Sequence, residues 1–130
     1  MANIAGARSS TVGRVLSGLV VLALVADSAA NLIMPRMLSD EIAATGFSLH
    51  QAPLIATIIL ICALLYAVPK TAVLGAILLT GFLGGAICTH FRLGELFSPP
   101  QIVCVTLGIL AWGGLYLRDA RVRTLLPLMS

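Results

Sequence analysis

Apolar residues form four long runs in this chain, and shorter segments with polar residues separate them. In a helix, about 20 apolar residues cross a hydrocarbon core of roughly 30 Å, so each run can form one membrane-spanning helix. Lipid cannot satisfy free backbone polar groups, which makes helices the expected conformation. The pattern therefore predicts an all-α, integral membrane four-helix bundle, with spans at about 12–34, 52–68, 71–89 and 101–117.

Prolines mark the ends of these runs. Pro35 ends the first run, because proline cannot continue the hydrogen-bond ladder of a helix. Pro69-Lys70 predicts a tight turn, so the second and third spans should form an antiparallel hairpin. The remaining segments complete the expected organisation: an N-terminal tail (1–11), a four-helix domain (12–124) and a C-terminal tail (125–130).

The first run and the first connection each allow a further interpretation. Ser28-Ala29-Ala30 offers a small-residue site for signal-peptide cleavage, but the apolar run continues past this site to Met34. In the connection, the loose spacing of apolar residues between Met37 and Phe47 predicts a short amphipathic turn or helix at the membrane interface.

Composition supports the membrane interpretation. Hydrophobic residues make up 59% of the chain and charged residues only 10%, against about 25% charged residues in soluble domains. Such a chain could not cover a water-exposed surface, so the lipid bilayer is its expected partner. The net charge of +3 is scattered and has no aromatic platform beside it, so we expect no nucleic-acid partner.

The distribution of basic residues predicts the orientation. Basic residues near helix ends favour the cytoplasmic side. Two basic residues, Arg36 and Arg92, lie on the side of the longer connections. Six lie on the side of the termini: Arg8, Arg14, Lys70, Arg118, Arg121 and Arg123. Because six exceed two, both termini are expected in the cytoplasm.

Small and aromatic residues suggest how the helices pack. Gly81 and Gly85 form a GxxxG pattern in the third span, and Gly84 lies beside it. Small residues let membrane helices approach closely, so we expect this span at the centre of the bundle, with a dimer face as the alternative. Belt anchoring at the interface is the interpretation for the aromatic residues Tyr66, Trp112 and Tyr116.

One acid lies inside a span. A charge at this depth costs about 2.5–3.5 kcal/mol on insertion scales, so Asp27 should face protein or water and have a partner. Other polar residues are expected in the same outer half, His50 and Gln101 among them. A structural role for Asp27, holding helices together, is the alternative. The functional interpretation is an outward-facing pocket for a small ligand, formed by Asp27, Asn31, Thr89, His90, Arg92 and Thr106.

Cysteine and histidine give little sign of redox or metal chemistry. Cys62, Cys88 and Cys104 form no CxxC pair, and each fits as a small apolar packing residue. A Cys88–Cys104 disulfide is geometrically conceivable. Two histidines without a suitable third ligand do not specify a metal site, so we predict none.

Three segments carry a resemblance to a known family: the run from Pro69 to Ala86, the Thr89-His90-Phe91-Arg92 motif, and the stretch from Trp112 to Asp119. Over residues 12–127 the chain resembles the DoxX-like family of small bacterial four-helix membrane proteins. The resemblance implies a multi-pass protein of the bacterial inner (plasma) membrane. Members often carry a lysine near the position of Asn31. This chain has no lysine there, so the Asp–Lys pair of the family is not expected in it.

The resemblance implies less about activity than about fold. Our first hypothesis is a protein of unassigned activity whose pocket near Asp27 binds a small ligand, lipid or quinone. The alternatives are an accessory subunit of a membrane oxidoreductase, of the thiosulfate/quinone or oxidative-stress kind, and a proton-coupled carrier acting as a dimer. No catalytic residue or cofactor is evident, although quinone remains a candidate ligand or cofactor. A homodimer and a larger membrane complex are both compatible with the sequence.

Overall fold

The computed structural model describes residues 2–126, with side chains described from Ile4 onward. The described chain is a succession of helices joined by short turns and loops. In chain order these are α1 (Ala2–Ile33), α2 (Ser39–Ala44), the 3₁₀ turn η1 (Leu49–Gln51), α3 (Ala52–Ala67), α4 (Ala72–Arg92), α5 (Pro99–Arg118) and α6 (Ala120–Leu125).

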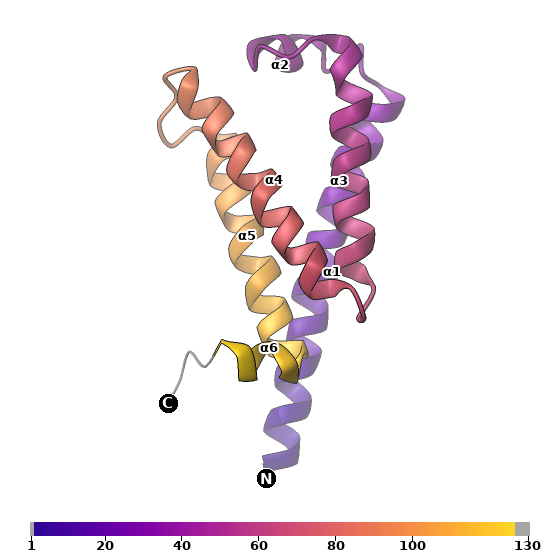
Figure 1. Ribbon diagram of the computed structural model, residues 1–130, viewed down its shortest axis with the longest axis vertical. Coiled ribbons are helices and arrows are strands. Elements are labelled where there is room, and N and C mark those ends of the chain that lie inside the picture. Colours follow the sequence, from indigo (N-terminus) through magenta and orange to yellow (C-terminus); the bar gives the residue numbers. More distant parts are fainter. Residues whose placement is uncertain (1, 127–130) are drawn as a thin grey trace.

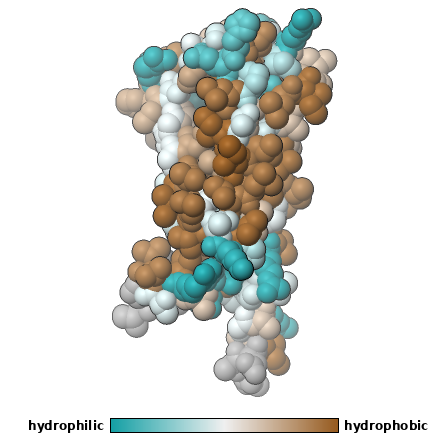
Figure 2. All heavy atoms as spheres, turned by 45° about the vertical axis from the view of Figure 1, so that its right-hand side comes forward, coloured by the Kyte–Doolittle hydropathy of each residue, from teal (hydrophilic) through white to brown (hydrophobic). Residues whose placement is uncertain are grey.

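Four helical segments are long and apolar enough to cross a membrane: α1, α3 together with η1, α4 and α5. Figure 2 shows apolar residues across the middle of one face of the molecule, with hydrophilic residues gathered above and below them. These observations confirm the predicted all-α membrane architecture. The observed bounds also agree closely with the predicted runs, except that α1 is longer.

The four long helices form a ring. α1 packs along α3 and α5, and α4 packs along the same two helices. α4 therefore does not hold the central position that we expected from its glycines, since α1 has equivalent neighbours. Figure 1 shows that α3 and α4 meet at their shared turn and diverge toward the opposite end of the molecule.

The bundle has two distinct ends. One end carries the start of α1, the α3–α4 turn and α6, and we call it the terminal end because the first and the last described helices meet there (Figure 1). The other carries α2, η1 and the α4–α5 loop, and we call it the connection end. Orientation across the membrane remains an expectation, with the terminal end on the cytoplasmic side.

Helix starts at the connection end follow from local sequence. Ser48 and Gln51 form a capping box that starts η1, and Ser98 and Gln101 form another that starts α5. Such boxes satisfy backbone N–H groups that have no partner within the helix. α2 is a short helix in the first connection, as expected, and Figure 1 shows it across the connection end of the bundle; its location at the membrane interface stays a prediction.

A hydrogen-bonded cluster lies in the core near the terminal end. Tyr66 is fully buried, and its hydroxyl donates to the backbone oxygen of Ala111 at 2.7 Å and accepts from Ser17 at 2.9 Å. Arg118 donates to the backbone oxygen of Tyr66 at 2.9 Å and lies over its ring. One tyrosine from α3 thus joins α1 and α5, so its assignment as an interface anchor was wrong.

Close backbone contacts occur at glycines other than those we predicted. A Cβ added at Gly75 would lie 2.3 Å from the backbone nitrogen of Tyr66, and one at Gly114 would lie 2.8 Å from the hydroxyl of Ser17. A Cβ at Gly81, Gly84 or Gly85 would meet nothing within 4 Å among the described residues. The predicted packing stripe therefore makes no close contact within the bundle, and its role as a dimer face stays a prediction.

The two tails also differ from expectation. α1 begins at Ala2, so residues 2–11, expected as a loosely ordered tail, are helical. With 32 residues, α1 would be about 48 Å long at 1.5 Å per residue, which exceeds the hydrocarbon core. At the other end, α6 reaches Leu125; the rest of the predicted C-terminal tail, 127–130, lies outside the described residues.

Candidate functional site

Asp27, on α1, is the one acid among the six predicted pocket residues. Its side chain is exposed, and no described cation forms an ion pair with it. It lies close enough to Glu41 on α2 and to Cys104 on α5 for its charge to act on both groups. The amide of Asn31 donates to the backbone oxygen of Asp27 at 2.9 Å, rather than to the carboxylate. The carboxylate is thus held by no helix-to-helix bond among the described residues.

Thr89 and Thr106 are satisfied within their own helices. Thr89 donates to the backbone oxygen of Gly85 at 3.0 Å, and Thr106 donates to that of Ile102 at 2.8 Å. Threonine hydroxyls commonly bond the carbonyl four residues earlier, which removes their need for another partner. Neither residue therefore requires a ligand to complete its hydrogen bonds.

His90 and Gln101 organise the loop between α4 and α5. The Nδ1 of His90 lies 2.7 Å from Oε2 of Glu95, and the amide of Gln101 donates to the Glu95 backbone oxygen at 3.1 Å. The partner of His90 is therefore Glu95, five residues later, and not Asp27. Sequence spacing alone could not distinguish these two carboxylates.

Arg92 extends from the end of α4 toward the first connection. A Cβ built on Gly46, in the loop between α2 and η1, would lie 3.3 Å from Nη2 of Arg92. The guanidinium therefore lies close to this loop, and no hydrogen bond between them is found among the described residues. Arg92 is exposed and forms no ion pair with a described carboxylate.

The six predicted pocket residues thus lie in the same half of the bundle, but they do not line a common cavity. Neither of the two cavities that stand out in the structure is lined by any of the six. The outward-facing pocket stays a prediction. What the structure does show at this end is a polar layer, formed by Asp27, Asn31, Thr89, His90, Arg92 and Thr106.

One of the two cavities is an apolar crevice of about 290 Å³ between α3 and α4, at the level of the hydrocarbon core. Sequence analysis missed it, because apolar side chains are expected on every lipid-facing surface and carry no separate signal. The crevice is lined by Ile58, Ile61, Cys62, Leu78 and Phe82, from the middle parts of α3 and α4.

The three cysteines are all free. Cys62 is buried beside the crevice, Cys88 is exposed, and Cys104 is half-buried. A dithiol mechanism requires a close cysteine pair, so this arrangement provides no support for one. The interpretation of these residues as apolar packing groups fits Cys62 best.

A family model described as the DoxX-like family matches residues 15–114. The chain belongs to the DoxX-like family. The matched segment contains the crevice and the whole polar layer, so both features lie in the part of this DoxX-like protein that carries the family pattern. It ends before Arg118 and begins after Arg14. No curated protein and no solved structure matches the chain.

Proposed function

We propose that this DoxX-like protein binds a lipid-like molecule with a long apolar chain, either a quinone or a phospholipid, in the crevice between α3 and α4. The observation that carries the proposal is the crevice itself: it is apolar, lies within the membrane-spanning region, and is left unfilled by the chain's own side chains. Its volume of about 290 Å³ is near the lower limit of small-molecule sites, roughly 300 Å³.

An apolar crevice alone gives little preference for one occupant. Bulk lipid chains are as apolar as the helices, so burying a chain here gains little hydrophobic free energy. Selectivity must come from shape and from polar contacts to a head group. Figure 1 shows that α3 and α4 diverge toward the connection end, and the polar layer at that end offers a carboxylate at Asp27, an imidazole at His90 and a guanidinium at Arg92. The proposal is that a quinone ring or a lipid head group reaches these groups.

The ligand class, lipid or quinone, is that of our first hypothesis, but the proposed site is different. The apolar chain of the ligand lies between α3 and α4, and the polar layer bounds the site at the connection end. With the termini in the cytoplasm of a bacterial cell, the polar layer would face outward from the inner membrane. The role is binding rather than catalysis, and a quinone occupant would favour a subunit of an oxidoreductase.

The test uses native mass spectrometry of the purified full chain, with solvent extraction to distinguish quinone from phospholipid by absorbance and mass. Ile61→Trp should fill the crevice, because Ile61 lines it and is half exposed. Leu64→Trp is the matched control, since Leu64 is similarly exposed on the same helix but does not line the crevice. We expect the wild type and Leu64→Trp to retain the molecule, and Ile61→Trp to lose it.

Three results would contradict the proposal. One is a wild-type protein that carries no adduct, and another is equal retention by both tryptophan variants. The third is a cross-link between two copies through the crevice, which would mean that a second chain fills it. A cross-link of that kind would instead favour the dimer that the carrier hypothesis requires.

A further inference from the structure

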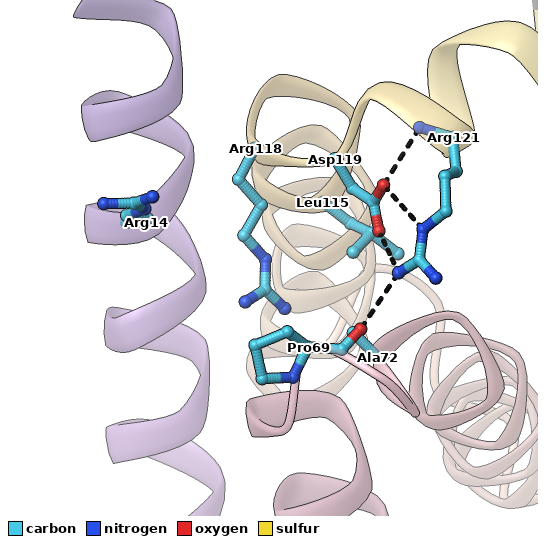
Figure 3. Close-up of a pocket in the computed structure, with 7 residues that line it drawn as sticks. All are labelled: Arg14, Pro69, Ala72, Leu115, Arg118, Asp119 and Arg121. Atoms are coloured by element: carbon cyan, nitrogen blue, oxygen red, sulfur yellow. Dashed lines mark hydrogen bonds and ion pairs between the residues drawn. The ribbon is translucent and has the colours of Figure 1, made fainter. Parts of the chain in front are cut away.

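Three arginines from different helices surround a second cavity, of about 260 Å³, at the terminal end. Arg14 comes from α1, Arg118 from the end of α5 and Arg121 from α6. Figure 3 shows the Arg118 guanidinium between α1 and the Asp119–Arg121 pair. We call this the arginine cavity. Its lining carries three positive charges and the single negative charge of Asp119.

The three arginines are not equally occupied. Arg121 donates to the carboxylate of Asp119 at 2.9 Å and to the backbone oxygen of Pro69 at 3.1 Å. Arg118 donates through Nη2 to Tyr66, but its buried Nε has no hydrogen-bond partner among the described residues. Arg14 is exposed and forms no hydrogen bond within the described chain. Arg14 and the Nη1 group of Arg118 therefore form no hydrogen bond within the described chain and keep donors for an anion.

The position of the cavity indicates where that anion comes from. Arg118 is the last residue of α5, and a Cβ at Gly13 would lie 2.7 Å from its backbone nitrogen. Arg14 and Arg118 are therefore at the same depth, at the boundary where spanning helices end. Ala72 and the fully buried Leu115 provide an apolar floor. Lipid phosphates lie at this depth, with acyl chains on their apolar side.

We propose that the arginine cavity binds the phosphate of an anionic phospholipid in the leaflet at the terminal end. Guanidinium groups match phosphate geometry because their N–H donors form a planar fork. Basic pockets between spanning helices bind anionic head groups in this way. The proposal is separate from the crevice, which lies on other helix faces and carries no charged lining residue.

The test compares phosphatidylglycerol with zwitterionic phosphatidylcholine, each added to the full-length protein in detergent and read by native mass spectrometry. Arg14→Gln removes one unoccupied guanidinium without breaking a described hydrogen bond. Arg8→Gln is the matched control, because Arg8 has the same charge on the same helix and does not line the cavity. A parallel arm adds inorganic phosphate alone.

We expect preferential retention of phosphatidylglycerol, reduced about fivefold by Arg14→Gln, as removal of one basic residue near a membrane surface predicts. Arg8→Gln should leave retention unchanged, and unchanged melting temperatures would show that both variants fold. Equal retention of the two lipids, or equal losses in the two variants, would overturn the site. Displacement of phosphatidylglycerol by inorganic phosphate would identify a soluble anion and overturn the lipid assignment.

Discussion

The two ends of the bundle use polar residues in opposite ways. At the terminal end, Ser17, Tyr66 and Arg118 bond to partners from other helices. At the connection end, Asn31 and Thr106, like Thr89, bond to the helix that carries them. Similar residue types thus tie helices together at one end and leave them separate at the other.

The number of polar residues inside the spans at one end of the bundle therefore does not identify a binding site. The connection end has more of them, yet most are satisfied locally, and α3 and α4 lie apart there (Figure 1). Ser28 and Gln101 are exceptions near this end: Ser28 donates to the backbone oxygen of Ala56 and joins α1 to α3, and Gln101 donates to that of Ile87 at 3.4 Å and joins α5 to α4. Each of these side chains joins two helices, whereas Tyr66 at the terminal end joins three.

The strongest test of this comparison uses two glycines of α4. Gly75→Ala should lower the free energy of unfolding by about 3 kcal/mol, because the added methyl group would meet the backbone of Tyr66 and overpacking has costs of this size. Gly85→Ala should change it by less than about 0.5 kcal/mol, since the methyl group meets no described atom. Unfolding in detergent, followed by circular dichroism, measures both values.

The pair also tests the predicted packing stripe. A large loss in Gly85→Ala would show that the stripe meets another helix, and a loss that depends on protein concentration would identify a second copy. A negligible loss of stability in Gly75→Ala would mean that the hairpin turn can move to accommodate the methyl group. The helices at the terminal end would then not be held together as tightly as their contacts indicate.

A smaller effect is expected from the hydroxyl of Tyr66. Tyr66→Phe should cost about 1 kcal/mol, because it leaves the buried Ser17 hydroxyl and the Ala111 oxygen without their partner. Thr106→Val removes a hydroxyl at the connection end that bonds only its own helix, so the unfolding free energy should hardly change. Equal losses in the two variants would erase the contrast between the ends.

The smallest effect concerns Asp119. Its hydrogen bond from Arg121 lowers the pKa of the carboxyl below the usual 3.8. A lowered folded-state pKa stabilises the protein above the unfolded-state value, and this contribution disappears as pH falls through the folded-state value. Arg121 is exposed, so Asp119→Asn should cost less than about 0.5 kcal/mol at pH 7. The difference from wild type should shrink as pH falls through the lowered folded-state pKa in acid titrations of stability; a constant difference would contradict the ion-pair interpretation.

The spans could be predicted from the sequence because lipid imposes a length and an apolar character that are visible in one chain. Packing could not, since glycine spacing is the same whether a neighbour is present or absent. Gly81 and Gly85 have the recognised spacing but no close neighbour, whereas Gly75 has no partner at that spacing and packs against a backbone. Tyr66 likewise has the position of an interface anchor, and only the crossing of α1, α3 and α5 buries it.

The candidate site was less accessible to prediction. Sequence placed Asp27 and His90 in the same half, but could not show that His90 bonds Glu95 in the adjacent loop. The crevice depends on the divergence of two helices, which no residue pattern encodes locally. The arginine cavity depends on where α5 ends and α6 turns back, which the sequence pattern does not show. From the sequence, the basic residues therefore predicted the orientation of the protein in the membrane but no binding site.

Two backbone oxygens near the hairpin turn, those of Tyr66 and Pro69, accept hydrogen bonds from arginines 52 residues later in the chain. Synthesis proceeds from the N-terminus, so the residues of α3 and α4 are made before either arginine exists. Until the arginines are made and reach the turn, these two oxygens depend on water or lipid head groups. Assembly of the terminal end is complete only when the last helix arrives, which makes the C-terminal segment the closing step of biogenesis.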